Sequence, residues 1–330
     1  MPRNLITDVS GVTVGHAHDA RLATGVTVVV FDPPATAAVD VRGGGPGTRE
    51  VDVLDPAATV DRIEAIVLSG GSAFGLDAAA GVQAYLREQG RGYVVGTTRV
   101  PIVPGAILFD LLNGGDKEWG RYPPYRDLAY AASKSASLDF ELGSVGAGAG
   151  ATTVNFKGGI GSASAVTADG VTVAALAAVN AAGSAVIADG PWFWAAPFEQ
   201  NREFGGHGFP AEMPQAALTA RTKGTARIST TLVVLATNAK LSKSQAKRLA
   251  MAGQTGLTRA IYPVHTPLDG DLVFAAATGE RELPDPVFAL MQLGALAANV
   301  VARAIARGVY EATALPFGGA LPAYRDAFGR

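Results

Sequence analysis

A group of small hydroxyl residues stands where an apolar segment begins late in the chain. Ser229, Thr230 and Thr231 run directly into residues 232–235, which read Leu-Val-Val-Leu. A threonine whose preceding peptide bond is cut carries its own α-amine beside its hydroxyl, and that amine activates a weak alcohol nucleophile. Thr230 is therefore a candidate nucleophile. The residues alone leave a second interpretation open, because threonine is also an ordinary strand former at the start of a buried strand.

Two carboxylates lie close together further along the chain. Asp269 and Asp271 flank Gly270 and follow His265, so both acids can point into one site. Beside the amine of a liberated Thr230 they would orient it and tune its pKa, which is ordinarily about 7.7 to 8.0. Asp-Gly is also the preferred pair of a type I′ turn, and the segment can form such a turn between strands.

A second candidate nucleophile, Ser72, follows two glycines. The segment around it misses the spacing of a nucleophile elbow, which needs Gly two residues after Ser, and we expect Ser72 to cap a helix. A triad of Ser72, His265 and Asp269 remains the alternative, as a serine hydrolase of another kind. We expect His16 and His18 to lie on the surface or in a turn rather than to bind zinc, because no further zinc ligands stand nearby.

Composition excludes several classes of function. The chain has 330 residues, enough for one large domain or two, with 27 Lys and Arg against 29 Asp and Glu and a net charge of -2. The sequence has no long basic run of the kind that indicates a nucleic-acid partner. Its glycine-rich stretches lack the fingerprints of phosphate and dinucleotide loops. The absence of cysteine excludes disulfides and thiol nucleophiles. The N-terminus lacks the apolar core of a signal peptide, so a cytoplasmic location without membrane insertion is the default expectation.

The pattern of apolar residues predicts interspersed helices and strands, which is typical of a layered α/β protein. A buried helix is expected over 287–306, with Asp285 as its cap, and another should follow Ser72 and stop at Gly90. Strands are expected at 25–31, 65–68, 93–95, 172–179, 232–236 and 272–276. The polar stretch 198–228 is long for a loop inside a compact domain. It ends at Ser229, so a cut before Thr230 would fall where a loop meets a strand.

Several motifs, in order over nearly the whole chain, resemble one family, the L-aminopeptidase/D-esterase (DmpA) family, which includes β-aminopeptidases and nylon-oligomer (6-aminohexanoate-oligomer) hydrolases. The matching segments are residues 6–12 with 14–16, 44–50, 68–76, 100–104, 157–161, 229–231 and 263–267 with 269–271. A threonine nucleophile with two aspartates is more similar to the nylon-oligomer hydrolases, since serine is expected in the β-aminopeptidases.

The resemblance implies a fold, a maturation step and site residues. The fold would be a single large domain, an αββα layered sandwich, built from two chains that the protein makes by cutting itself, 1–229 and 230–330. Thr230 would be the nucleophile, Asn180 would help to hold the oxyanion, and Asp269 and Asp271 would be the acidic pair.

Two positions depart from the nylon-oligomer hydrolases. Phe109 stands where those hydrolases have a tyrosine, and their active-site lysine aligns with either Asn155 or Lys157. Phe109 and Ser72 are the candidate substrate-binding residues. The resemblance further implies a small amide, peptide or oligoamide substrate, no metal or organic cofactor, and a homo-oligomer of four or more copies. A non-processed homologue that only binds a ligand is the remaining alternative.

Overall fold

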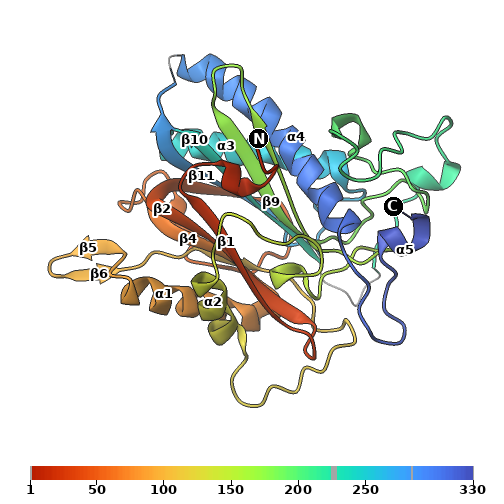
Figure 1. Ribbon diagram of the computed structural model, residues 1–330, viewed down its shortest axis with the longest axis horizontal. Coiled ribbons are helices and arrows are strands. Elements are labelled where there is room, and N and C mark those ends of the chain that lie inside the picture. The colour runs from red at the N-terminus through yellow and green to blue at the C-terminus, as the bar shows by residue number, and fades with distance from the viewer. Residues whose placement is uncertain (1, 224–228, 284, 330) are drawn as a thin grey trace.

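Two β-sheets pack face to face between two layers of helices (Figure 1). The computed structural model describes residues 2–223, 229–283 and 285–329. The first sheet contains β1 (Val12–Asp19), β2 (Thr24–Val41), β4 (Ile63–Ser69), β7 (Gly105–Ile107) and β3 (Thr48–Arg49). The second contains β11 (Leu272–Arg281), β10 (Thr230–Ala239), β9 (Thr172–Asn180) and β8 (Ile160–Val166). A separate hairpin, β5 (Tyr93–Val95) and β6 (Thr98–Val100), projects from the body.

The long strand β2 belongs to both sheets. Its first part pairs with β1 and β4, and its last part, from Thr36 to Val41, pairs with β11. Pro33 and Pro34 lie between these two parts. Proline has no backbone N–H to give to a ladder, and the pairing with β4 is interrupted here, resuming only at Ala35 before the strand joins the second sheet at Thr36. The two sheets are thereby held in a fixed relation at one side of the sandwich.

Alternation along the strands separates three apolar layers. On β10, Leu232 and Val234 face the core between the sheets, whereas Val233 and Leu235 pack under α3 (Lys243–Ala260) and α4 (Pro286–Tyr310). Residues of the first sheet that face outward pack under α1 (Ala78–Glu88) and α2 (Tyr125–Lys134). Successive side chains of a strand point to opposite faces, and the order of layers is therefore α, β, β, α, as predicted.

Helix α4 has the cap and the burial that the sequence predicts. The Asp285 side chain accepts a hydrogen bond from the Phe288 N–H at 3.1 Å. Val287–Tyr310 is long and apolar enough to cross a membrane by length and composition alone, and half of that window is buried. Val300 and Ile305 are fully buried, whereas Val287 is 83% exposed. The helix packs on β8 and β9, which is the role of a core helix in a layered fold.

The six predicted strands are present, most of them longer than expected, but other elements depart from the sequence interpretation. Helices α2 and α3 were not predicted. Gly161, which no strand prediction covers, belongs to β8, where a Cβ on it would lie 1.9 Å from the Ala304 carbonyl oxygen of α4. This close approach of strand to helix explains the glycine. His16 and His18 lie within β1 rather than in a turn, and burial lowers the pKa of His16 to about 4.

Candidate active site

Strand register brings two predicted site residues together. Thr230, the first residue of β10, lies opposite Asn180, the last residue of β9. Residues paired across a ladder share a face of the sheet, and these two share the face of Leu232 and Ala178, which points toward the other sheet. Thr230 is 2% exposed and Asn180 1%. The end of this ladder therefore holds a hydroxyl and a carboxamide side by side, out of reach of bulk water.

The Thr230 hydroxyl lies on the carbonyl group that precedes it. Its Oγ1 donates a hydrogen bond to the Ser229 carbonyl oxygen at 2.6 Å. The Gly270 N–H donates to the same oxygen at 2.8 Å. The Gly270 N–H can stabilise negative charge that develops on this oxygen, because a fixed backbone donor favours an oxyanion. A Cβ at Gly270 would lie 2.6 Å from Thr230 Oγ1, so only glycine fits there without displacing the hydroxyl.

The segment that carries the two acids is not the predicted Asp-Gly turn. The turn lies earlier, and the Asp269 N–H closes it on the Thr266 carbonyl at 3.0 Å. From Asp269 onward the chain is extended, and Asp269 forms a parallel bridge with Ser229. Proline at 267 starts the turn readily because its φ is already suited to a turn. The consequence is that residues 269–271 run alongside the Ser229–Thr230 peptide bond.

The two acids differ in how their oxygens are satisfied. Asp271 accepts from the Thr231 N–H at 2.7 Å and from the His265 N–H at 3.1 Å, and it lies 3.1 Å from His265 Nδ1. Asp269 accepts from the Thr266 N–H at 2.8 Å with one oxygen. Its other oxygen is buried without a hydrogen-bond partner among the described residues. Burial and the neighbouring Asp271 raise the pKa of Asp269.

Unpaired polar atoms gather around the same peptide bond. Within the described part of the chain, Ser229 Oγ, His265 Nε2 and Asp269 Oδ1 are buried without a hydrogen-bond partner. Such atoms are rare in folded proteins, and a chemical role is one of the explanations for them. Their grouping makes the Ser229–Thr230 junction a candidate reaction site.

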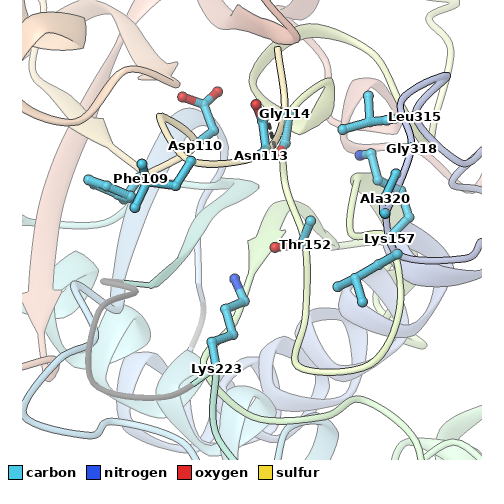
Figure 2. Close-up of a pocket in the computed structure, with 14 residues that line it drawn as sticks. Phe109, Asp110, Asn113, Gly114, Thr152, Lys157, Lys223, Leu315, Gly318 and Ala320 are labelled. Atoms are coloured by element: carbon cyan, nitrogen blue, oxygen red, sulfur yellow. Dashed lines mark hydrogen bonds between the residues drawn. The ribbon is translucent and has the colours of Figure 1, made fainter.

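A cavity of about 230 Å³ is connected to this junction through Asn180 (Figure 2 shows the cavity). Phe109, Asp110, Thr152, Lys157 and Lys223 are among the residues that line it. Thr230 is not one of its lining residues, and Asn180 makes the connection. The Asn180 side chain accepts from the Thr152 N–H at 3.0 Å and donates to the Phe109 carbonyl at 2.9 Å. Asn180 thus touches both β10, where it is paired with Thr230, and the wall of the cavity.

Lys157 is one of the two lysines among the lining residues of the cavity. Its Nζ donates to the carbonyl oxygens of Gly148 and Gly158 at 2.8 and 2.6 Å, and the residue is 1% exposed. Burial lowers the pKa of Lys157 to about 7, and the negative charge of Asp110 opposes that shift. Asn155, the other residue that aligns with the lysine of the nylon-oligomer hydrolases, hydrogen-bonds to Ser184 at 3.1 Å and is not a lining residue.

Ser72 lies outside this arrangement. It begins a short 3-10 helix, Ser72–Asp77, with φ +52, and its N–H donates to the Leu108 carbonyl at 2.9 Å. The cap position belongs to Gly71 and no side chain caps the helix, so the predicted capping role is wrong. Ser72 does not line the cavity, and the His265 ring contacts Asp271 instead.

Three contributors to the site were missed by sequence reasoning. The Gly270 N–H and the side chains of Asp110 and Lys223 lie within it. Asp110 is buried, accepts from Thr24 Oγ1 at 2.6 Å and from the Gly71 N–H at 2.8 Å, and burial raises its pKa. No group of three or more His, Asp or Glu side chains that could hold a metal ion occurs in the ranges that the structure describes.

Comparison with known proteins agrees with the motif resemblance. The family model for peptidase family S58 matches residues 4–319. An uncharacterized aminopeptidase of Mycobacterium tuberculosis (strain ATCC 25618 / H37Rv) is 44% identical over 98% of both chains. The 6-aminohexanoate-oligomer endohydrolase of Paenarthrobacter ureafaciens is 30% identical, over 84% of this chain and 76% of its own length.

Solved structures share the fold. The L-aminopeptidase D-Ala-esterase/amidase of Ochrobactrum anthropi, described as a variant of the Ntn-hydrolase fold, superposes with a TM-score of 0.71 at 20% identity and covers 100% of this chain and 95% of its own. A Burkholderia sp. β-aminopeptidase gives a TM-score of 0.69 at 23% identity over 98% and 91% of the two chains. The chain is thus an amide-bond hydrolase, and it belongs to peptidase family S58, the DmpA family.

Proposed function

We propose that the protein cuts its own chain between Ser229 and Thr230, and that the new N-terminal threonine then hydrolyses amide substrates. The observation that carries the proposal is the placement of the buried Thr230 hydroxyl 2.6 Å from the Ser229 carbonyl oxygen. The Gly270 N–H on that same oxygen supplies the polarisation that attack requires. The products would be a large chain, 1–229, and a small chain, 230–330, that together form the one layered domain.

In the first reaction, Thr230 Oγ1 attacks the Ser229 carbonyl carbon. The bond between that carbon and the Thr230 nitrogen breaks, an ester to the threonine oxygen forms, and the hydroxyl proton passes to the departing nitrogen. Water then hydrolyses the ester, leaving a carboxylate at Ser229 and a free hydroxyl and amine at Thr230. The partnerless oxygen of Asp269 lies on the segment bridged to Ser229 and is available to accept a hydrogen bond from the new amine.

In the second reaction, the free amine takes the proton of the Thr230 hydroxyl, and the oxygen attacks a substrate amide. An acyl-enzyme forms, the substrate's amine leaves, and water releases the acid. Asn180 is placed to assist because it lies beside Thr230 and touches the cavity wall. Lys157, Phe109 and Asp110 would contact the substrate in the cavity, where the buried lysine supplies a proton donor or acceptor near neutral pH.

The substrate we propose is a small peptide or oligoamide. The names of two relatives, an uncharacterized aminopeptidase and a 6-aminohexanoate-oligomer endohydrolase, motivate this range. We also expect the protein to be a cytoplasmic homo-oligomer of four or more copies. Size-exclusion chromatography with light scattering would check the number of copies.

Mass spectrometry of the purified protein tests the central claim. We expect two fragments, the smaller one beginning at Thr230, and we expect Thr230→Ala to remain one chain without amidase activity. The matched control is Thr231→Ala, which changes the adjacent threonine on the opposite face of β10 and should still be cut. Full activity of an uncut wild-type chain, or of Thr230→Ala, would overturn the proposal.

A further inference from the structure

A lysine from the segment that precedes the cleavage site occupies the cavity of the uncut chain. Figure 2 shows the Lys223 side chain pointing into the cavity, toward Thr152. Its Nζ donates to the Asn180 side-chain oxygen at 3.1 Å and to the Asn180 carbonyl oxygen at 3.3 Å. The two residues before it, Arg221 and Thr222, are exposed, whereas Lys223 is half-buried.

We propose that Lys223 is an internal occupant of an ammonium-binding subsite, and that it blocks this subsite until the chain is cut. The inference rests on the proposed self-cleavage, because Lys223 stands shortly before the Ser229–Thr230 bond on the same chain. In the uncut protein, Lys223 is joined covalently to Thr230 through the chain, and its Nζ contacts Asn180. After the cut, the segment has a free end, and its ammonium group must compete with that of a substrate.

The chemistry of the contacts identifies what the subsite takes. Both Asn180 atoms that Lys223 touches are carbonyl-type oxygens, which accept hydrogen bonds and donate none. A primary ammonium group has three donors and no acceptor, so it satisfies both oxygens at once. The flexible four-carbon stem of lysine lines the cavity, as do the apolar side chains of Phe109 and Leu112. A substrate with an ammonium group on an aliphatic chain would make the same contacts.

The consequence for the nucleophile follows from the position of Asn180. Asn180 lies opposite Thr230 in the ladder, and its side-chain nitrogen already donates to the Phe109 carbonyl. While Lys223 holds its oxygens, the acceptors of the residue opposite Thr230 are occupied by the protein itself. The uncut chain is thereby kept from binding an ammonium-bearing amide, and binding and maturation are coupled without any further subunit.

The blocking can be measured in protein that cannot be cut. The background is full-length Thr230→Ala, and the probe is 6-aminohexanamide, whose dissociation constant is measured by ligand-observed NMR. A tethered group that fills the subsite for about 90% of the time weakens external binding about tenfold. We therefore expect Lys223→Met in this background to bind the probe at least tenfold more tightly than the background alone, with Lys223→Gln as a second, polar replacement.

Arg221→Met is the matched control. It removes a cation from the same segment, but Arg221 pairs with Asp189 at 2.7 Å instead of entering the cavity. It should leave the dissociation constant unchanged. Equal binding of the probe by the background and by both Lys223 variants would overturn the inference, as would equal strengthening by Arg221→Met. Because all these proteins are uncut, the outcome is separate from the test of self-cleavage, which mass spectrometry of the wild-type chain decides.

Discussion

One side of the site is formed by residues at the ends of paired strands of the second sheet, whereas the other side is formed by residues in loops. Ser229, Thr230 and Asn180 are fixed by the ladder of β9 and β10, and Asp269 to Asp271 lead into β11. On the other side, Phe109 and Asp110 follow the short strand β7 of the first sheet, and Lys157 also lies in a loop, the one that precedes β8 of the second sheet.

This difference separates bond-making from substrate selection. A paired strand end holds its atoms against a rigid hydrogen-bonded ladder, which suits groups that must stay within tenths of an ångström of a reacting carbonyl. Loops vary in length and side chain without disturbing the core, and they suit the wall of a cavity that must fit a particular amide. Substitutions on the ladder side should therefore affect cutting most, and substitutions on the loop side should affect binding or stability.

Asn180→Ala should give the largest effect among the ladder residues beside the nucleophile. It removes the carboxamide that lies opposite Thr230 and bonds to the cavity wall. Losing one oxyanion donor lowers the rate by about 10²- to 10³-fold, so we expect kcat on an amide substrate to fall by that factor. The measurement is steady-state kinetics on protein that has been cut, as checked by mass spectrometry. A change confined to KM would assign Asn180 to substrate binding alone.

The strand side of the site is also the side that sequence reasoning predicted best. Thr230 and the two acids follow from residue type and from the start of an apolar run. The Gly270 N–H could not be predicted, because every residue but proline carries that donor and only the extended path of 269–271 aims it. Asp110 and Lys223 were missed because loops place them, and no periodicity describes a loop. The expected Asp-Gly turn failed because Pro267 starts the turn earlier.

Gly270→Ala tests whether self-cleavage requires the contact between the Ser229 carbonyl and the Thr230 hydroxyl. The new Cβ would lie 2.6 Å from Thr230 Oγ1, so the hydroxyl or the acid segment must shift. A misplacement of about 1 Å can slow a reaction about 10²-fold, and we expect self-cleavage to slow by at least that much in a time course on gels.

The control for Gly270→Ala is Gly45→Ala, beside the same acid segment. There a Cβ would meet its nearest atom, the Asp269 carbonyl oxygen, at 3.8 Å, which is an ordinary contact. This variant should be cut at the wild-type rate. If both variants are cut at the wild-type rate, the hydrogen bond from Gly270 to the Ser229 carbonyl does not limit self-cleavage. The claim that fixed geometry at the strand ends controls cutting would then be wrong.

Lys157→Met probes the loop side through the dependence of stability on pH. The folded protein lowers the pKa of Lys157 from 10.5 to about 7 by burying it. Between these values the unfolded lysine is protonated and the folded one is largely neutral, so the free energy of unfolding rises with pH across that window, by at most about 1.4 kcal/mol per unit from this group. Urea unfolding of uncut Thr230→Ala at pH 7, 8 and 9 should show the rise, and adding Lys157→Met should flatten it. Parallel profiles would mean that the lysine is solvated.

Ser72→Ala should have the smallest effect, and it separates the two candidate nucleophiles. The side chain is half-buried, caps no helix and lines no part of the cavity, and its backbone N–H, which the substitution keeps, makes the contact with Leu108. We expect self-cleavage and kcat/KM to stay within about twofold of wild type, as for a substitution away from reacting groups. A drop of 10³-fold or more with cutting intact would instead make Ser72 the nucleophile toward substrates and leave Thr230 with maturation alone. Because Ser72 follows β4 of the first sheet and does not lie in a strand, that result would place the reacting group among the loops. The proposed division, with reaction at the strand ends and substrate binding in the loops, would then be wrong.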